Sequence, residues 1–160
     1  MKKFMMGWLP VLLVIGVIFY SSSQPYKKQD MRSSIVQHVN PETVKQMFSW
    51  VHFHYGHSEI SIAHDGVGGF LEFFIRKGAH FCVFFTLGFL ACRAFFYSGI
   101  SRRNAFLFPL LLVASYASFD EIHQWFTGDR TPLWQDSLLD TIGGLTGITV
   151  RSLMQRKSRG

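Results

Sequence analysis

Four apolar stretches, each about long enough to cross a membrane, constrain the fold of this chain more than any other feature. They cover residues 4–20, 78–99, 105–126 and 137–153. A transmembrane helix needs about 20 mostly apolar residues to cross a hydrocarbon core of about 30 Å, and a backbone exposed to lipid must satisfy its hydrogen bonds within its own segment. The sequence therefore predicts an all-α integral membrane bundle of four transmembrane helices. The lengths disfavour the alternative, a soluble helical bundle.

The composition agrees with a membrane protein. The chain is 48% hydrophobic and only 16% charged, whereas about a quarter of the residues in a soluble domain are charged. Its formal net charge is +6, but many of the cations flank the apolar stretches, as they do in membrane proteins. No arginine-rich tract with interleaved aromatic residues is present, so we expect membrane lipids as partners and no nucleic acid.

The N-terminus also has features of a secretory signal. Lys2 and Lys3 precede the first apolar stretch, and residues 21–23 could offer a small-residue cleavage site. The stretch is longer than a typical signal core, and three more apolar stretches follow it. We therefore expect an uncleaved first helix.

The distribution of cations predicts the orientation, because Lys and Arg favour the cytoplasmic side. Arg102 and Arg103 lie in a tight turn and the C-terminal tail is basic, whereas most other cations are spread along a long loop. We expect both termini to be cytoplasmic and residues 127–135 to lie outside. The expected order is 1–20 as the first transmembrane helix, 21–75 as an extracellular loop with a surface helix, 76–154 as a three-helix membrane core and 155–160 as a cytoplasmic tail.

The long loop has structural signals of its own. Asn40 can cap a helix that has Pro41 at its first position. Apolar residues then follow at helical spacing, namely Val44, Met47, Phe48, Val51 and Tyr55. The pattern predicts an amphipathic helix on the outer membrane surface, followed by a turn at residues 64–69.

Four histidines crowd the same loop, at positions 52, 54, 57 and 64. Histidine is a common ligand of transition metals. Their spacing matches no defined zinc signature, however. We therefore predict no metal site and no cofactor.

Ionisable and polar residues gather at the ends of three of the apolar stretches. They are Lys77 and His80 in the second, Asp120, Glu121 and Gln124 in the third, and Asp136 and Asp140 in the fourth. An up-down-up-down bundle brings these three ends to one membrane face, and residues three or four apart share one side of a helix. A lone charge in a membrane costs roughly 2.5–3.5 kcal/mol, so these side chains should face one another, with Arg76, Lys77 and Arg130 as the cations. The sequence predicts one outward-facing polar pocket.

The alternative is that each charge serves its own helix end. Asp136 could be a carboxylate favoured by the helix dipole, and Asp129 with Arg130 could form an ordinary turn. A separate pattern concerns Gly143 and Gly147, which are spaced for close helix–helix approach. We expect them to pack against a neighbouring helix, with oligomerisation as the alternative.

This ordered set resembles the VanZ-like family, whose founding member is associated with low-level resistance to the glycopeptide teicoplanin. The resemblance rests on Lys77-x-x-His80, Asp120-Glu121-x-x-Gln124, Arg130, Asp136, Gly143 and Gly147, and it covers residues 76–148; residues 19–25 are also similar. Three positions depart from the family: Val83 and Phe84 stand where members often carry Glu-Tyr, and Asp140 stands where Asn is common. The resemblance implies an integral membrane protein of a bacterial envelope, in the plasma membrane.

Two functions are compatible with the pocket. In the first, it binds a lipid-linked cell-wall precursor, a glycopeptide or another anionic ligand and contributes to resistance. Lys77 and Arg130 would hold an anionic headgroup, because ammonium and guanidinium groups suit phosphate, and the expected ligand-binding residues are Lys77, Gln124, Arg130, Asp136 and Asp140.

In the second, the protein is a membrane enzyme that modifies a lipid headgroup or cell-wall precursor. His80 would be the acid–base group, and Glu121 or Asp120 its partner. The chain has no nucleophile elbow, phosphate-binding glycine loop or zinc-protease helix. We therefore favour the binding role and keep the enzyme as the alternative.

Overall fold

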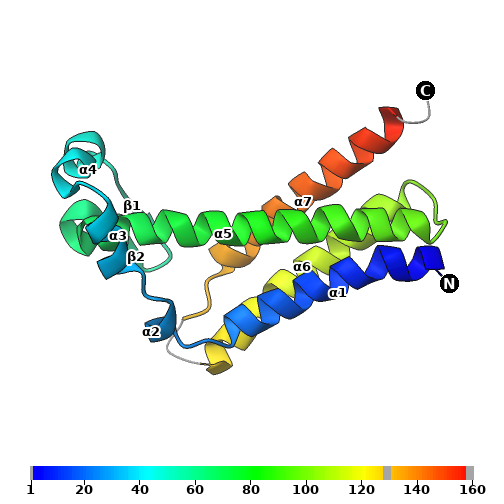
Figure 1. Ribbon diagram of the computed structural model, residues 1–160, viewed down its shortest axis with the longest axis horizontal. Coiled ribbons are helices and arrows are strands. Elements are labelled where there is room, and N and C mark those ends of the chain that lie inside the picture. The colour runs from blue at the N-terminus through cyan, green and yellow to red at the C-terminus, as the bar shows by residue number, and fades with distance from the viewer. Residues whose placement is uncertain (1, 128–130, 158–160) are drawn as a thin grey trace.

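Four long helices form the body of the protein in the computed structural model, which describes residues 2–127 and 131–157. They are α1 (Lys2–Ser22), α5 (Ile62–Tyr97), α6 (Asn104–Thr127) and α7 (Trp134–Lys157). Helices α1 and α6 lie beside α5, and α7 packs against α5 and α6 before it slants away towards its C-terminal end (Figure 1). Large side chains fill the space between the helices; Phe84, Leu87, Val113 and Ile148 are fully buried.

Three of these helices are long and apolar enough to cross a membrane. The candidate spans in the described part of the chain are Phe4–Ser22, Ile62–Tyr97 and Asn104–Thr127. The chain is therefore a mostly helical protein with the spans of a membrane protein, as predicted. A fourth span at residues 137–153 is not confirmed, because α7 is long but more polar than the other three helices.

Helix α5 begins well before the predicted second span. Ser61 caps it, since its Oγ accepts a hydrogen bond from the His64 N–H at 3.1 Å. The predicted turn at residues 64–69 is confirmed only in part: these residues lie within α5, but Gly66 departs from helical geometry, with φ of 67° and ψ of 172°, and separates two helical segments. Glycine adopts such a conformation without steric cost, so the helix kinks there and continues.

The loop between α1 and α5 contains short elements. They are α2 (Tyr26–Gln29), α3 (Arg32–His38), α4 (Pro41–Phe48), β1 (His52–Tyr55) and β2 (Ser58–Ser61). Asn40 caps α4 as predicted, because its Oδ1 accepts a hydrogen bond from the Glu42 N–H at 3.0 Å. The placement of α4 on a membrane surface stays a prediction.

The helical spacing predicted for Val51 and Tyr55 is wrong, since α4 ends at Phe48. Tyr55 lies instead in an antiparallel hairpin of β1 and β2. Histidine alternates with an aromatic residue over 52–55, a period-two pattern that favours a strand, and Gly56 allows the turn with φ of 62°.

Small residues let α7 approach the backbone of α5. A Cβ added at Gly147 would lie 2.0 Å from the carbonyl oxygen of Phe85, and one at Gly143 would lie 2.6 Å from that of Phe81. The prediction of close packing against a neighbouring helix is therefore confirmed, and the neighbour is α5 of the same chain.

A Gly147→Leu substitution tests this contact. The added side chain would force α7 away from α5, and overpacking of this kind typically costs about 1–3 kcal/mol or more. We expect a lower temperature of thermal unfolding in detergent. Gly16→Leu is the matched control, because nothing lies within 4 Å of a Cβ at Gly16; equal unfolding temperatures for the two variants would refute the close contact.

Candidate functional site

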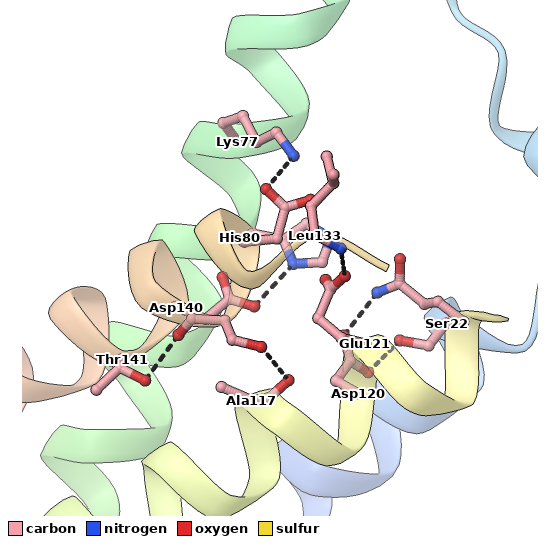
Figure 2. Close-up of polar contacts among 12 residues, drawn as sticks. Ser22, Lys77, His80, Ala117, Asp120, Glu121, Leu133, Asp140 and Thr141 are labelled. Atoms are coloured by element: carbon pink, nitrogen blue, oxygen red, sulfur yellow. Dashed lines mark hydrogen bonds and ion pairs between the residues drawn. The ribbon is translucent and has the colours of Figure 1, made fainter. Parts of the chain in front are cut away.

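One ion pair and one histidine–carboxylate contact join α5 to α7 near the end of the bundle where α7 begins (Figure 2). Lys77 Nζ lies 2.5 Å from Asp136 Oδ1. One turn further along, His80 Nδ1 lies 3.3 Å from Asp140 Oδ2. Asp140 is completely buried, so its carboxylate is held inside the helix bundle, next to the imidazole.

Helix α6 adds two buried carboxylates to the same region. Asp120 accepts hydrogen bonds from Gln124 Nε2 at 2.7 Å and from the Ser22 hydroxyl at the end of α1. Glu121 Oε2 accepts a hydrogen bond from the Leu133 N–H at 3.0 Å, which ties the segment before α7 to α6. All four helices of the bundle therefore contribute to one polar cluster, whose carboxylates and their partners are shown in Figure 2.

Tyr55 of the β-hairpin contacts the cluster at Lys77 and Asp136. Tyr55 Oη donates a hydrogen bond to Asp136 Oδ1 at 2.5 Å, and the Lys77 ammonium lies 4.8 Å from the centre of the Tyr55 ring. Burial and the neighbouring Asp136 carboxylate raise the pKa of the Tyr55 phenol. Tyr55 thus stays protonated and holds Asp136 in place, while its ring stabilises the Lys77 cation.

A second ionic group lies one turn before Lys77 on α5. Glu72 is buried, and its carboxylate oxygens accept hydrogen bonds from Arg76 Nη2 at 2.7 Å and from Arg32 Nε at 2.9 Å. The Met31 N–H also points to it, at 3.4 Å. This group anchors the start of α3 to α5 beside the cluster.

The structure brings together most of the predicted site residues: Lys77, His80, Asp120, Glu121, Gln124, Asp136 and Asp140. Arg130 lies outside the described residues. One predicted pairing differs, because the carboxylate within reach of the His80 Nδ1 atom is that of Asp140 and not that of Glu121 or Asp120.

Three residues of this region were not predicted. Glu72 lies four residues before Arg76, a spacing that favours an ion pair on a helix, but the predicted span began too late to include it. The alternating pattern of residues 52–55 indicates that Tyr55 lies in a strand, although not that it reaches Asp136. No local signal indicates that Ser22 contacts Asp120.

Two adjoining cavities open on the cluster. A polar cavity of about 390 Å³ is lined by charged and polar residues of α5, α6 and α7, among them Arg76, Lys77, His80, Glu121, Gln124 and Asp136. A larger cavity of about 530 Å³ lies between α1 and α5, with mostly apolar walls that include Val17, Ile75, Ala79 and Val83. Arg76, His80 and Gln124 line both cavities, so these side chains form their common wall.

Two buried carboxylate oxygens have no hydrogen-bond partner among the described residues. They are Asp140 Oδ1 and Glu121 Oε1. A buried acceptor without a donor costs free energy. The cluster therefore retains two positions at which a cation, a proton or a donor group of a ligand could bind.

Comparison with known proteins gives one match. A family model described as VanZ/LLP1 matches residues 7–155. Neither the curated proteins nor the solved structures gave a match to the chain. The match contains every site residue named above.

A double-mutant cycle tests the Lys77–Asp136 pair. Lys77→Met and Asp136→Asn each leave one partner uncompensated, and removing one partner of a fully buried pair costs about 3–5 kcal/mol. These side chains are 20% and 18% exposed, so we expect each variant to lose about 1–3 kcal/mol of stability in detergent. The double variant should lose less than the sum of the two.

The exposed pair of Lys45 and Glu42 is the control, with N and O atoms 2.9 Å apart. Its side chains are 49% and 72% exposed, so Lys45→Met should change stability by less than about 1 kcal/mol. Additive losses at Lys77 and Asp136 would contradict a direct ion pair.

Proposed function

The chain belongs to the VanZ/LLP1 family, and on that premise we propose that its polar cavity binds the anionic headgroup of a lipid-linked ligand. The ligand is a membrane lipid or cell-wall precursor at the outer face of a bacterial plasma membrane. By holding such a ligand, the protein would contribute to resistance to glycopeptides of the teicoplanin type.

The observation that carries this proposal is the pair of adjoining cavities. The apolar cavity between α1 and α5 suits a hydrocarbon chain, and the polar cavity suits a headgroup. Val83 lines the apolar cavity, and its described lining residues include no carboxylate that would disfavour a hydrocarbon chain.

Cationic groups on the polar wall supply the affinity for an anion. Arg76 and Lys77 both line the polar cavity, and their charged groups suit phosphate oxygens. Asp136 and Tyr55 position the Lys77 ammonium, while the Gln124 amide can donate to a further ligand oxygen. Asp140 is buried behind His80 and would act by orienting that imidazole.

The proposed orientation places both termini in the cytoplasm. The turn between α5 and α6, which carries Arg102 and Arg103, lies at the same end of the bundle as the start of α1 (Figure 1). Cations in short connections favour the cytoplasmic side. The cluster and the segment from α2 to β2 lie towards the other end, which would then be external.

Lipid binding by the Lys77→Met variant tests this function. A polyprenyl diphosphate and the matching neutral polyprenol are added to full-length protein in nanodiscs, and binding is measured by native mass spectrometry. We expect the wild type to prefer the diphosphate. Loss of a charged hydrogen bond costs about 1.5–3 kcal/mol, so Lys77→Met should bind the diphosphate about 10–150-fold more weakly.

The control for this measurement is Lys45→Met, which removes an exposed cation on α4 and should bind like the wild type. Teicoplanin sensitivity of cells that express each variant at equal abundance supplies the second readout. Equal binding of the diphosphate and the polyprenol by the wild type would overturn the proposal.

The enzymatic alternative is favoured by one observation, the buried Asp140 carboxylate beside His80. A carboxylate that orients a histidine is a common arrangement for acid–base catalysis, and His80 lines both cavities. In this alternative His80 transfers a proton to or from the bound headgroup, with Asp120 and Glu121 close by.

His80→Ala distinguishes the two functions. If the protein is an enzyme, cells that express this variant should lose a lipid or wall-precursor species made by the wild type, while purified His80→Ala still binds the polyprenyl diphosphate. Lipid extracts and wall precursors are compared by mass spectrometry. Identical profiles with and without the wild-type protein would exclude the enzymatic alternative.

A further inference from the structure

We propose that His80, Asp120 and Asp140 bind a divalent transition-metal ion. Each residue offers one donor atom, and the three atoms lie within 4.8 Å of one another. The donors come from α5, α6 and α7, and Figure 2 shows His80 and the two carboxylates grouped at the junction of these helices. This inference does not depend on the proposed lipid ligand.

The geometry of the histidine and Asp140 fits a shared ion. Zinc lies about 2.0–2.2 Å from nitrogen and carboxylate oxygen, so two ligands of a tetrahedral ion are separated by roughly 3.3–3.5 Å. His80 Nδ1 and Asp140 Oδ2 are 3.3 Å apart, which is long for a hydrogen bond between charged groups, usually about 2.7–2.9 Å. The third donor, an Asp120 oxygen, lies within 4.8 Å of the other two and would have to approach by up to about 1.5 Å to complete the set.

Asp140 provides an independent indication of a missing ligand. Its side chain is completely buried, and its Oδ1 atom has no hydrogen-bond partner among the described residues. The histidine contact uses only the other oxygen. A metal ion bound by both oxygens of Asp140 would also satisfy this unpaired acceptor inside the bundle.

The second carboxylate is held in position by neutral groups. Asp120 is 1% exposed and accepts its hydrogen bonds from the Ser22 hydroxyl and the Gln124 amide. Hydrogen bonds of this kind orient metal-binding carboxylates and increase their affinity. They leave the negative charge of Asp120 uncompensated, so the position suits a cation.

The charges around His80, Asp120 and Asp140 also favour a bound cation. Asp120 and Asp140 bring two negative charges, and the Lys77 ammonium on α5 is paired with Asp136. Glu121 adds a further buried carboxylate from α6. One divalent cation and a neutral imidazole would balance Asp120 and Asp140 without a proton, and neutralisation is favoured because charge in a membrane interior is costly.

The donor set also indicates the class of metal. One imidazole with two carboxylates suits zinc, manganese or iron(II), whereas magnesium and calcium prefer sites built from oxygen alone. Three protein ligands leave at least one position open, as in catalytic zinc sites. His80 lines both cavities, so the open position is within reach of a bound headgroup if the proposed function holds.

Metal titration of the full-length protein in detergent tests the site. The protein is treated with chelator, dialysed and titrated separately with Zn²⁺, Mn²⁺ and Mg²⁺. Bound metal is counted by mass spectrometry, and the unfolding temperature is followed. We expect one equivalent of Zn²⁺ per chain, with Zn²⁺ bound more tightly than Mn²⁺, a rise in unfolding temperature and no such effect of Mg²⁺.

Three variants locate the site. Asp140→Asn and His80→Gln should each lower zinc affinity more than 100-fold, and Ser22→Ala should lower it about 10-fold by loosening Asp120. His64→Ala is the matched control and should bind like the wild type, because His64 also pairs with a carboxylate, at 3.0 Å from Asp65, but on an exposed surface.

The unfolding temperatures of the metal-free proteins distinguish loss of the metal site from loss of the fold. Asp140→Asn removes a buried charge, so without metal it should unfold at the same temperature as the metal-free wild type or higher, and zinc should not stabilise it. If the wild type binds no metal, the proposal is overturned. A markedly destabilised Asp140→Asn would then indicate a proton shared by His80 and the carboxylates. Lipid binding is measured on chelator-treated protein, so failure of the metal site would leave that result intact.

Discussion

The structure depends first on the register between α5 and α7, which run alongside each other in the same direction. Lys77 meets Asp136, His80 meets Asp140, and Gly143 and Gly147 meet the backbone of Phe81 and Phe85. The polar contacts and the glycine contacts therefore occupy successive turns of one helix pair. Close approach at the glycines makes these polar contacts possible, because side chains reach across only where the helix axes are near. A shift of one turn would break both sets at once.

The other elements complete this end of the bundle. Helix α6 supplies Asp120 and Glu121, α1 supplies the Ser22 hydroxyl, and the hairpin supplies Tyr55. Each of these groups contacts a carboxylate or is one. A lone charge within an apolar helix would be costly. The acidic residues hold the ends of α1, α6 and α7 together by accepting hydrogen bonds from Ser22, Gln124 and the Leu133 N–H.

The polar cluster could be predicted from the sequence because three apolar stretches carried charges at ends that a bundle brings together. The glycine contact was also predictable, because two glycines four residues apart on a helix typically allow close packing against another helix. The partner of His80 was not predictable, because it depends on the register of α7 against α5. Glu72 and Tyr55 were missed because α5 begins 16 residues before the apolar stretch at residue 78 and because a four-residue strand was read as helix.

The position of His80 links the two proposed functions. The imidazole lies at the common wall of the apolar and polar cavities and contacts a carboxylate that is sealed from solvent. A purely structural ion pair would gain nothing from facing a cavity, since a hydrophobic pair of similar size is often at least as stable. A ligand whose chain lies between α1 and α5 would bring its headgroup to this side chain. Whether His80 then binds the headgroup, transfers a proton or holds a metal depends on what neutralises Asp120 and Asp140, so the charge state of these two carboxylates decides between binding and catalysis.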